Sequence, residues 1–348
     1  MNLQLSHLAL SSVFSSLILT GNSWRNVGIS ESRFDRSISC LFYSNMQNRF
    51  NFAANRVVFS NFLVSSIQII RLEHENMIIN KTLVVENDSK VVISKCSFEN
   101  CKSNENGGSI LIDNIEADIN ILDSVFISSV SEKHGGAIYA NVRNANIKNC
   151  VFSKCYAGPS FSYQSYYFCV GQIGSFELCA VQQCGVSKEY EGFSTIGIRQ
   201  GITTTKDLNS SSNSILSWGS GISVVNTLMS SVVIEFCSFF NNSQTMFDVF
   251  CFHNSNNMCD LHDNNFVQNE GSKNGMLFAA ITNAYIYVRN SVIYHNNVGS
   301  LATISDLAVV LFENCVLDVD PGVSKTVHNI DCLFSKKDIT TIPARRIQ

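Results

Sequence analysis

Short apolar stretches of strand length recur along this chain, and polar or small residues separate them. The stretch NCVFSKC (149–155) has a Cys two places before a Phe and another three places after it, and KCSFENC (95–101) repeats this spacing. LCAVQQC (178–184) has the same spacing around Val. Apolar or small residues at alternate positions are typical of a strand with one buried face, because neighbouring side chains of a strand point to opposite faces. The pattern therefore predicts many short β-strands.

The apolar residue inside this unit marks a repeat of nearly constant length. Steps of 28, 26 and 29 residues join Phe98, Phe126, Phe152 and Val181. Backward steps of 28 reach Ile70, Phe42 and Phe14, and forward steps reach Phe239, Phe266, Ile293 and Leu317. A period in the twenties over a whole chain is the signature of a solenoid. One marker is missing near Ser210, where the polar stretch 207–214 predicts a loop.

Two further columns of residues accompany the marker. Two residues before it stand Cys40, Cys96, Cys150, Cys179, Cys237 and Cys315, with small residues in the other repeats. Three residues after it stand Asn45, Cys101, Cys155, Cys184, Asn242, Asn269 and Asn296. Since positions i and i−2 of a strand face the same way, we expect the first column to point inward. We expect the second to lie past the strand end, where Asn tolerates left-handed dihedrals and hydrogen-bonds backbone.

Glycine marks a second fixed place, about nine residues after the marker. It occurs as Gly107-Gly108, as Gly135-Gly136 and as Gly275, and an apolar strand follows each. Glycine before a strand permits a sharp corner. Each repeat therefore contains at least two strands, and stretches such as ADINIL (117–122) predict a third.

These repeats predict an all-β fold, a single-stranded parallel β-helix of about twelve coils of ~28 residues. We expect it to cover residues 1–332, with irregular, insertion-bearing coils near 156–235, and to end in a polar tail at 333–348. A β-sandwich would lack the constant period. A leucine-rich repeat would show a Leu/Asn framework, which this sequence does not have.

The stretches KHGGAIYA (133–140) and FFNN (239–242) resemble repeats of the chlamydial polymorphic outer-membrane (Pmp) proteins, which carry GGAI and FxxN. The sequence resembles more closely the Pmp-like β-helix surface proteins of parasitic protists such as trichomonads, whose rungs are also rich in Cys. FxxN falls at Phe42/Asn45, Phe239/Asn242 and Phe266/Asn269. The resemblance implies a right-handed coil, in line with the rule for parallel crossovers. It also implies an exposed, adhesin-like or structural role.

Composition and charge narrow the classes of function. With a net charge of −4, the chain lacks the excess of positive charge that binds nucleic acid, so we expect no nucleic-acid partner. No stretch approaches the roughly 18 apolar residues of a membrane-spanning helix. The first residues resemble a secretion signal, but they lack a basic segment and their apolar run contains Ser and His. We therefore expect neither a membrane-spanning segment nor a standard signal, although the resemblance favours the cell surface or secretion.

Nine of the thirteen cysteines fall in the two columns, and two interpretations of them stay open. A buried Cys can serve as a small hydrophobic side chain beside the Phe column. Alternatively, stacked neighbours such as Cys155 and Cys184 can form disulfides in an oxidising compartment, since rungs about 4.8 Å apart lie within disulfide range.

The stretch CFHNSNNMCDLH (251–262) contains Cys251, His253, Cys259 and His262, residue types that bind zinc. Their spacing matches no common zinc framework, and the stretch leads into the strand of Phe266. We therefore expect ordinary turn and strand residues here and no cofactor.

Many parallel β-helices degrade polysaccharides, so the acids clustered at 113–123 need a test. Asp118 and Asp123 are the catalytic candidates among them. Glycosidases need two carboxylates about 5 to 9.5 Å apart, and lyases need a basic partner beside an acid. Because Arg143 and Lys148 belong to the next coil, we expect no Arg in register with these acids and expect the acids to be solvated.

The sequence thus favours a non-catalytic interaction protein that binds glycans or partner proteins of a host along a long solenoid face. A carbohydrate-active enzyme of the β-helix type is the first alternative. A truncated relative that has lost its function is the second.

Overall fold

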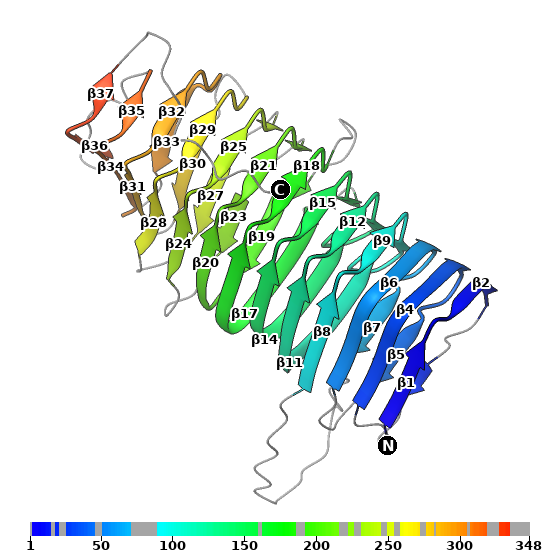
Figure 1. Cartoon of the computed structure of the whole chain (residues 1–348). Coiled ribbons are helices and arrows are strands. Elements are labelled where there is room, and N and C mark those ends of the chain that lie inside the picture. Colours follow the sequence, from blue (N-terminus) through cyan, green and yellow to red (C-terminus); the bar gives the residue numbers. More distant parts are fainter. Residues whose placement is uncertain are drawn as a thin grey trace, which may run out of the picture.

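The computed structural model is an elongated rod of stacked coils, with the first strands at one end and the last at the other (Figure 1). It describes residues 2–14, 18–20, 26–45, 51–70, 89–158, 162–185, 192–215, 222–225, 231–244, 249–253, 258–271, 276–281, 283–304, 307–318 and 327–334. All its regular elements over these ranges are β-strands, and their pairing is parallel throughout. The protein is therefore a parallel β-solenoid, as predicted.

Three walls of parallel strands enclose the core. We call them the groove wall, which carries the groove described below, the marker wall and the third wall. The groove wall contains β1 (Asn2–Ser6), the first halves of β4 (Asn26–Ser37) and β6 (Asn51–Phe62), β8 (Ser89–Ser94), the second halves of β11 (Ile110–Leu122), β14 (Ile138–Lys148) and β17 (Ser162–Glu177), then β20 (Ile202–Lys206), β24 (Val232–Glu235), β28 (Met258–His262), β31 (Tyr285–Arg289), β34 (Val309–Glu313) and β36 (Val327–Ile330).

The marker wall carries the predicted marker residues. It contains β2 (Ala9–Val13), the second halves of β4 and β6, β9 (Ser97–Glu99), β12 (Val125–Ile127), β15 (Val151–Ser153), β18 (Ala180–Gln182), β21 (Asn209–Ser211), β25 (Ser238–Phe240), β29 (Asn265–Val267), β32 (Val292–Tyr294), β35 (Val316–Leu317) and β37 (Leu333–Phe334).

The third wall contains β3 (Ile18–Thr20), β5 (Phe42–Asn45), β7 (Ile67–Ile70), the first halves of β11, β14 and β17, then β19 (Gly192–Arg199), β23 (Ile222–Val225), β27 (Phe250–His253), β30 (Met276–Ile281) and β33 (Ser300–Ile304). Short strands lie between the marker and third walls: β10 (Lys102–Ser103), β13 (Val130–Ser131), β16 (Tyr156–Ala157), β22 (Ser214–Ile215) and β26 (Ser243–Gln244).

A column of aromatic rings runs through the core behind the marker wall. Phe98 pairs in register with Phe126, and Phe126 with Phe152. The ring centroids of these successive pairs lie 4.7 and 4.8 Å apart with nearly parallel planes. The rings are fully buried, and the register continues from Phe152 through Val181. Stacked coils thus place each inward residue against its counterpart in the next coil, which makes the core continuous along the rod.

The missing marker is Ser210 itself. It lies in β21, in register between Val181 and Phe239, and is fully buried. The loop predicted at 207–214 is therefore wrong. A polar residue fits in this column because the Ser210 hydroxyl accepts a hydrogen bond from the Asn213 amide at 3.0 Å.

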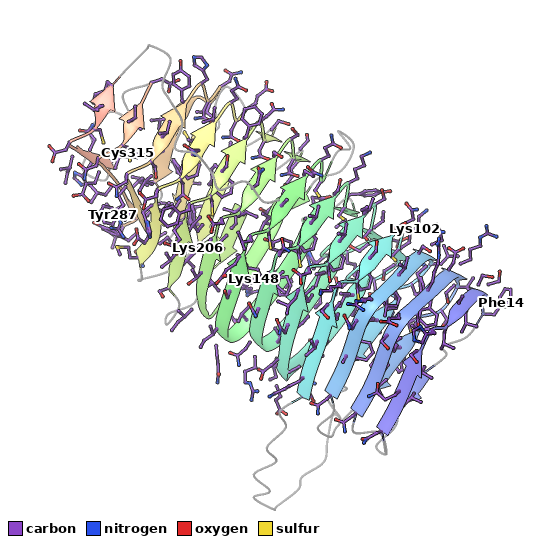
Figure 2. All side chains as sticks on the ribbon, viewed as in Figure 1. Phe14, Lys102, Lys148, Lys206, Tyr287 and Cys315 are labelled. Carbon is purple, nitrogen blue, oxygen red and sulfur yellow. The ribbon has the colours of Figure 1, made fainter. Side chains whose placement is uncertain are left out.

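Extending the marker column backward in steps of 28 was also wrong. The column continues from Phe98 to Phe59 and Phe34. Phe42 is buried but belongs to the third wall, where it pairs with Ile67. Phe14 lies at the N-terminal end of the rod and is 74% exposed (Figure 2).

Like Phe42, Cys40 and Asn45 do not belong to the columns predicted for them. Cys40 is buried just before β5, and Asn45 pairs with Ile70 at the end of that strand. The step from Phe59 to Phe98 is 39 residues, because the segment 71–88 falls between these two coils. A spacing of 28 counted back from Phe98 therefore ends on a different wall.

Coils of nearly constant length, predicted as about twelve coils of ~28 residues, fill only part of the rod, and they are slightly shorter. Leu317 lies 219 residues after Phe98, and eight register steps join the two. The regular part of the rod thus has about nine turns of about 27 residues. At the predicted tail, Leu333 and Phe334 form β37, and residues 335–348 lie outside the described part of the chain.

A single residue with positive φ on each side of the marker strand forms the corners of the coil. Asp123 (φ 50°) and Ser128 (φ 52°) flank β12, and Asn149 and Lys154 flank β15 in the same way. The left-handed residue therefore lies two positions after the marker. The expectation that residues of the column three positions after it, such as Cys155, adopt these dihedrals was wrong.

Side chains of that column instead satisfy backbone carbonyls of the preceding coil. The amides of Asn242, Asn269 and Asn296 donate to carbonyls at 3.0, 3.0 and 2.7 Å. The thiols of Cys101, Cys155 and Cys184 donate to the equivalent carbonyls at 3.7, 3.5 and 3.8 Å. Cys occupies this column in the earlier coils and Asn in the later ones, because both are small donors that reach the same acceptor.

The inward column two residues before the marker uses the same chemistry. Cys96, Cys150, Cys179, Cys237 and Cys315 are buried, and each thiol donates to the carbonyl two residues earlier at 3.2 to 3.3 Å. None of the twelve cysteines whose side chains the structure describes forms a disulfide.

The predicted corner glycines lie where a coil turns into the third wall. Gly107 and Gly135 have φ of 65° and 68°, and the Gly107 amide donates to the His134 carbonyl of the next coil at 2.9 Å. A Cβ at Gly108 would lie 2.1 Å from the Gly136 carbonyl oxygen, so stacked coils leave no room for a side chain there. Gly275 lies outside the described residues.

Candidate binding surface on the groove wall

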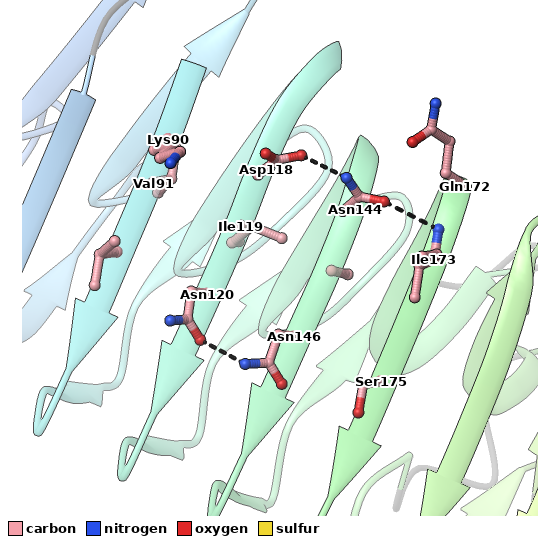
Figure 3. A pocket seen from close by; sticks show the side chains of 12 residues that line it. Lys90, Val91, Asp118, Ile119, Asn120, Asn144, Asn146, Gln172, Ile173 and Ser175 are labelled. Carbon is pink, nitrogen blue, oxygen red and sulfur yellow. Dashed lines mark hydrogen bonds between the residues drawn. The ribbon is translucent and has the colours of Figure 1, made fainter. Parts of the chain in front are cut away.

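The outward side chains of four neighbouring coils form a shallow groove. It has a volume of about 430 Å³ and crosses β8, β11, β14 and β17 (Figure 3). Strand alternation produces it, because Ile119 and Ile121 point into the core and leave Asp118 and Asn120 outside. The polar side chains that line it are Lys90, Asp118, Asn120, Asn144, Asn146, Gln172 and Ser175. The groove therefore presents one cation, one carboxylate and several amides on a rigid sheet.

Asp118 has a fixed position because the next coil holds both of its oxygens. The Nε and Nη2 atoms of Arg143 donate to them at 2.9 and 2.6 Å, and the Asn144 amide donates to Oδ1 at 2.8 Å. The expectation that no Arg is in register with these acids was wrong, since a neighbouring coil is one strand spacing away. Partial burial would raise the pKa of Asp118, but these hydrogen bonds outweigh it and lower the pKa below its usual value.

Asp123 lies at the corner that follows β11 and not in the groove. Its φ is 50°, and its carboxylate accepts a hydrogen bond from the Asn149 amide at 2.7 Å. Five residues separate it from Asp118, about 16 Å along a strand. This exceeds the roughly 5 to 9.5 Å that glycosidase carboxylates require. The two candidates thus do not form a catalytic pair.

Amide side chains connect the coils along the groove. The Asn146 amide donates to Asn120 Oδ1 at 3.0 Å, and Asn144 Oδ1 accepts from the Ile173 backbone N–H at 3.1 Å (Figure 3). Asn2, Asn26 and Asn51 continue the column of Asn144 toward the N-terminal end, with amide-to-amide bonds of 2.7 and 2.8 Å. Amide side chains therefore recur at the coil spacing along this wall.

The four Cys and His residues that were only weak candidates for zinc lie on two different walls. Cys251 and His253 belong to β27 of the third wall, and their side chains are not among those described. Cys259 points into the core from β28, whereas His262 points outward, 2.8 Å from Asp263 and 3.6 Å from Glu235. Cys259 and His262 therefore cannot share a metal ion. Within the described ranges, no three metal-binding side chains converge.

The buried thiols lie in surroundings that favour the neutral form. Burial raises the pKa of Cys96 to about 11 and the pKa values of Cys101, Cys237 and Cys315 to about 12. A thiol is nucleophilic as its thiolate, so these cysteines are poorly suited to reaction in the folded state.

Sequence reasoning missed the groove residues Asn120, Asn144 and Asn146. The signal was present, because Asp118 and Asn120 lie 26 residues before Asn144 and Asn146, which is the step from Phe126 to Phe152. Outward positions carry no Phe or Cys pattern, so the repeat that the inward columns define does not single them out.

Comparison with protein-family models, curated proteins and solved structures finds no significant match. In the described part of the chain, no helix is present that is long and apolar enough to cross a membrane.

Proposed function

We propose that this protein is a non-catalytic binding protein that holds an extended polar ligand, best matched by a glycan, in the groove of β8, β11, β14 and β17. The observation that carries the proposal is the row of amide and charged side chains repeated from coil to coil in a groove of about 430 Å³. Hydroxyl-rich polymers also repeat donors and acceptors along their length. A rigid sheet restricts the side chains before binding, which reduces the entropic cost of association.

The electrostatics of the groove support a neutral or weakly charged ligand. Arg143 and Asp118 neutralise each other, so Lys90 is the cation left among the lining side chains. A polyanion would find little attraction here, whereas amides of Asn120, Asn144 and Asn146 suit hydroxyl groups.

The resemblance to Pmp-like proteins supports display at the cell surface or secretion for this binding role. It rests on the GGAI stretch at 135–138 and the FxxN pairs such as Phe239/Asn242. Protease treatment of intact cells, followed by detection of the protein, tests this location. Full protection from the protease would contradict surface display and leave the groove proposal standing.

Binding to a panel of immobilised polysaccharides and glycans tests the groove. We expect a double substitution, Asn120→Ala with Asn146→Ala, to weaken binding roughly tenfold, because each lost hydrogen bond contributes about 0.5–1.5 kcal/mol. Gln182→Ala is the matched control, since this side chain is exposed on the marker wall away from the groove. Equal loss in both variants, or no glycan bound by the native protein, would contradict the proposal.

A carbohydrate-active enzyme is the second candidate, because the Asp118 carboxylate lines the groove and is paired with Arg143, and lyases need a basic residue beside an acid. Product formation from pectin-like and other polysaccharides tests it, with Asp118→Asn and Asp123→Asn as variants. Turnover that disappears in these variants would replace the binding proposal with the enzymatic one.

A further inference from the structure

Cysteines of adjacent coils lie side by side at three places in the described part of the chain. The register of the marker wall pairs Cys150 with Cys179, Cys155 with Cys184, and Cys315 with Cys332. In-register residues of neighbouring strands lie about 4.8 Å apart, which is within the Cα separation that a disulfide spans. Each pair can therefore be oxidised if a reagent reaches a thiol and if the two coils can approach each other.

The first two pairs meet neither condition. All four of their thiols are buried, and further coils lie in register on both sides of each pair. The Cβ atoms of a disulfide are about 3.8 Å apart, closer than the strand spacing, so bonding would pull a coil away from packed neighbours. These two pairs thus have the right spacing but neither the access nor the freedom to react.

The third pair lies at the C-terminal end of the rod, where Cys315 precedes β35 and Cys332 precedes β37 (Figure 2). Backbone hydrogen bonds fix its register on both sides. The Asn314 N–H donates to the Ile330 carbonyl at 3.0 Å, and the Leu333 N–H donates to the Cys315 carbonyl at 2.8 Å. Each thiol donates to the carbonyl two residues earlier, at 3.3 and 3.5 Å, so the two side chains have the same orientation.

Access and freedom distinguish this pair from the other two. Cys332 is partly exposed, whereas Cys315 is fully buried. The strand β37 pairs with β35 along one edge, and no described strand pairs with its other edge. Its residues Leu333 and Phe334 are 68% and 51% exposed. Little packing therefore opposes the shift of about 1 Å that brings this coil to disulfide distance.

We propose that Cys332 and Cys315 are a redox modification site, at which a small disulfide such as glutathione disulfide oxidises the two thiols and ties β36 and β37 to the preceding coil. The Cys332 thiol loses its proton to water and attacks the small disulfide, which forms a mixed disulfide and releases one small thiolate. The Cys315 thiol then loses its proton and attacks the Cys332 sulfur, which releases the second. The two thiolates take up the two protons, so two protein thiols are oxidised and one small disulfide is reduced.

The surroundings of the two thiols set the order of these steps. Burial, and less strongly the neighbouring Cys332 thiol, raise the pKa of Cys315 to about 12. Cys315 is therefore a poor first nucleophile, and Cys332 reacts first because solvent reaches it. In the second step, the high effective concentration of a thiol one coil away offsets its raised pKa. Since one sulfur of the product stays accessible, a dithiol reductant can reverse the reaction.

Reaction of the reduced native protein with glutathione disulfide, followed by peptide mass spectrometry without reduction, tests the proposal. We expect the link between Cys315 and Cys332 to form roughly tenfold faster, or more, than any link within the two buried pairs. Those pairs are the matched control, because they have the same register and the same strand spacing.

Serine variants separate the two roles. In Cys315→Ser, the mixed disulfide with glutathione should remain on Cys332, and in Cys332→Ser, Cys315 should stay unmodified. Serine fits this column, because Ser124 and Ser291 occupy it in other coils, are buried, and donate to the carbonyl two residues earlier at 2.7 and 2.8 Å. Far-ultraviolet circular dichroism verifies that each variant is folded.

Hydrogen exchange measures what the link does to the last described coil. Amides of β36 and β37 should exchange roughly tenfold more slowly in the oxidised protein than in the reduced one, because the link opposes local opening. Amides of β12, in the middle of the rod, are the control and should not change. Dithiothreitol should restore the faster exchange.

A folded protein that forms no link between Cys315 and Cys332 would overturn the proposal. Equally fast linking of the buried pairs, or a mixed disulfide that persists on Cys332 of the native protein, would overturn it as well. So would a link that leaves exchange in β36 and β37 unchanged. These measurements use no glycan, so their outcome is independent of the proposed function.

Discussion

Cys155 and Asn242 occupy equivalent places in their coils and form the same hydrogen bond. The Cys155 thiol donates to the Phe126 carbonyl at 3.5 Å, and the Asn242 amide donates to the Ser210 carbonyl at 3.0 Å. Each acceptor is the marker residue of the preceding coil. The column three residues after the marker therefore needs a small hydrogen-bond donor, which either residue type supplies.

This equivalence predicts that Cys184→Asn is tolerated better than Cys184→Leu. An asparagine side chain at this position would extend the amide ladder that joins Asn213, Asn242 and Asn269 at 2.9 and 3.1 Å. A leucine would leave the Phe152 carbonyl without its donor, a loss of about 1–3 kcal/mol in the free energy of unfolding. Urea denaturation of both variants measures the difference, and equal midpoints would contradict the interpretation.

The aromatic column predicts a large difference between two neighbouring residues of β12. Phe126→Ala should lower the free energy of unfolding by about 3–5 kcal/mol, because it removes a fully buried ring between Phe98 and Phe152. Ile127 points outward from the same strand, so Ile127→Ala should change the free energy of unfolding by about 0.5 kcal/mol or less. Similar losses from both substitutions would contradict the placement of the column.

The buried thiols predict a loss of stability in alkaline solution. The pKa of Cys237 is about 12 in the folded protein, against 9.0 for an unperturbed thiol. The stabilising contribution of this raised pKa is fully present below pH 9 and is lost as the pH rises toward 12, because the unfolded thiol releases its proton first. Urea midpoints measured from about pH 7 to about pH 11 should fall. They should fall less steeply in Cys237→Ser, and an identical slope would contradict the assignment.

The same burial predicts slow chemical modification. Iodoacetamide at neutral pH should leave Cys101 and Cys237 unmodified in the native protein and alkylate both in urea. Peptide mass spectrometry identifies the modified positions. Rapid alkylation without denaturant would show that the thiols are accessible.

The Asp118–Arg143 pair predicts a small effect in acid. The lowered pKa of Asp118 gives stability that is present above the pKa of an unfolded carboxyl and is lost as the pH falls through the folded value. Since the side chain is partly exposed, Asp118→Asn should cost about 1 kcal/mol or less at neutral pH. It should also flatten the acid limb of the stability profile, which denaturation from about pH 6 to about pH 2 measures. An unchanged acid limb would contradict this contribution.

Repetition in the sequence determined the fold class, because each coil buries its own inward residues against those of its neighbours. Phe98, Phe126 and Phe152 recur at the coil length, and Gly107 and Gly135 recur at the corner. These are local constraints that every coil must satisfy for itself, so they are visible along the chain.

The wall to which a residue belongs was decided by the tertiary structure. Phe42 and Phe59 are both buried aromatic residues, but only Phe59 joins the marker column. All three walls bury apolar side chains, so periodicity cannot distinguish them once residues 71–88 change the count. The groove and the Asp118–Arg143 pair depend on outward side chains of adjacent coils, which stacking brings together and which leave no repeated apolar signal.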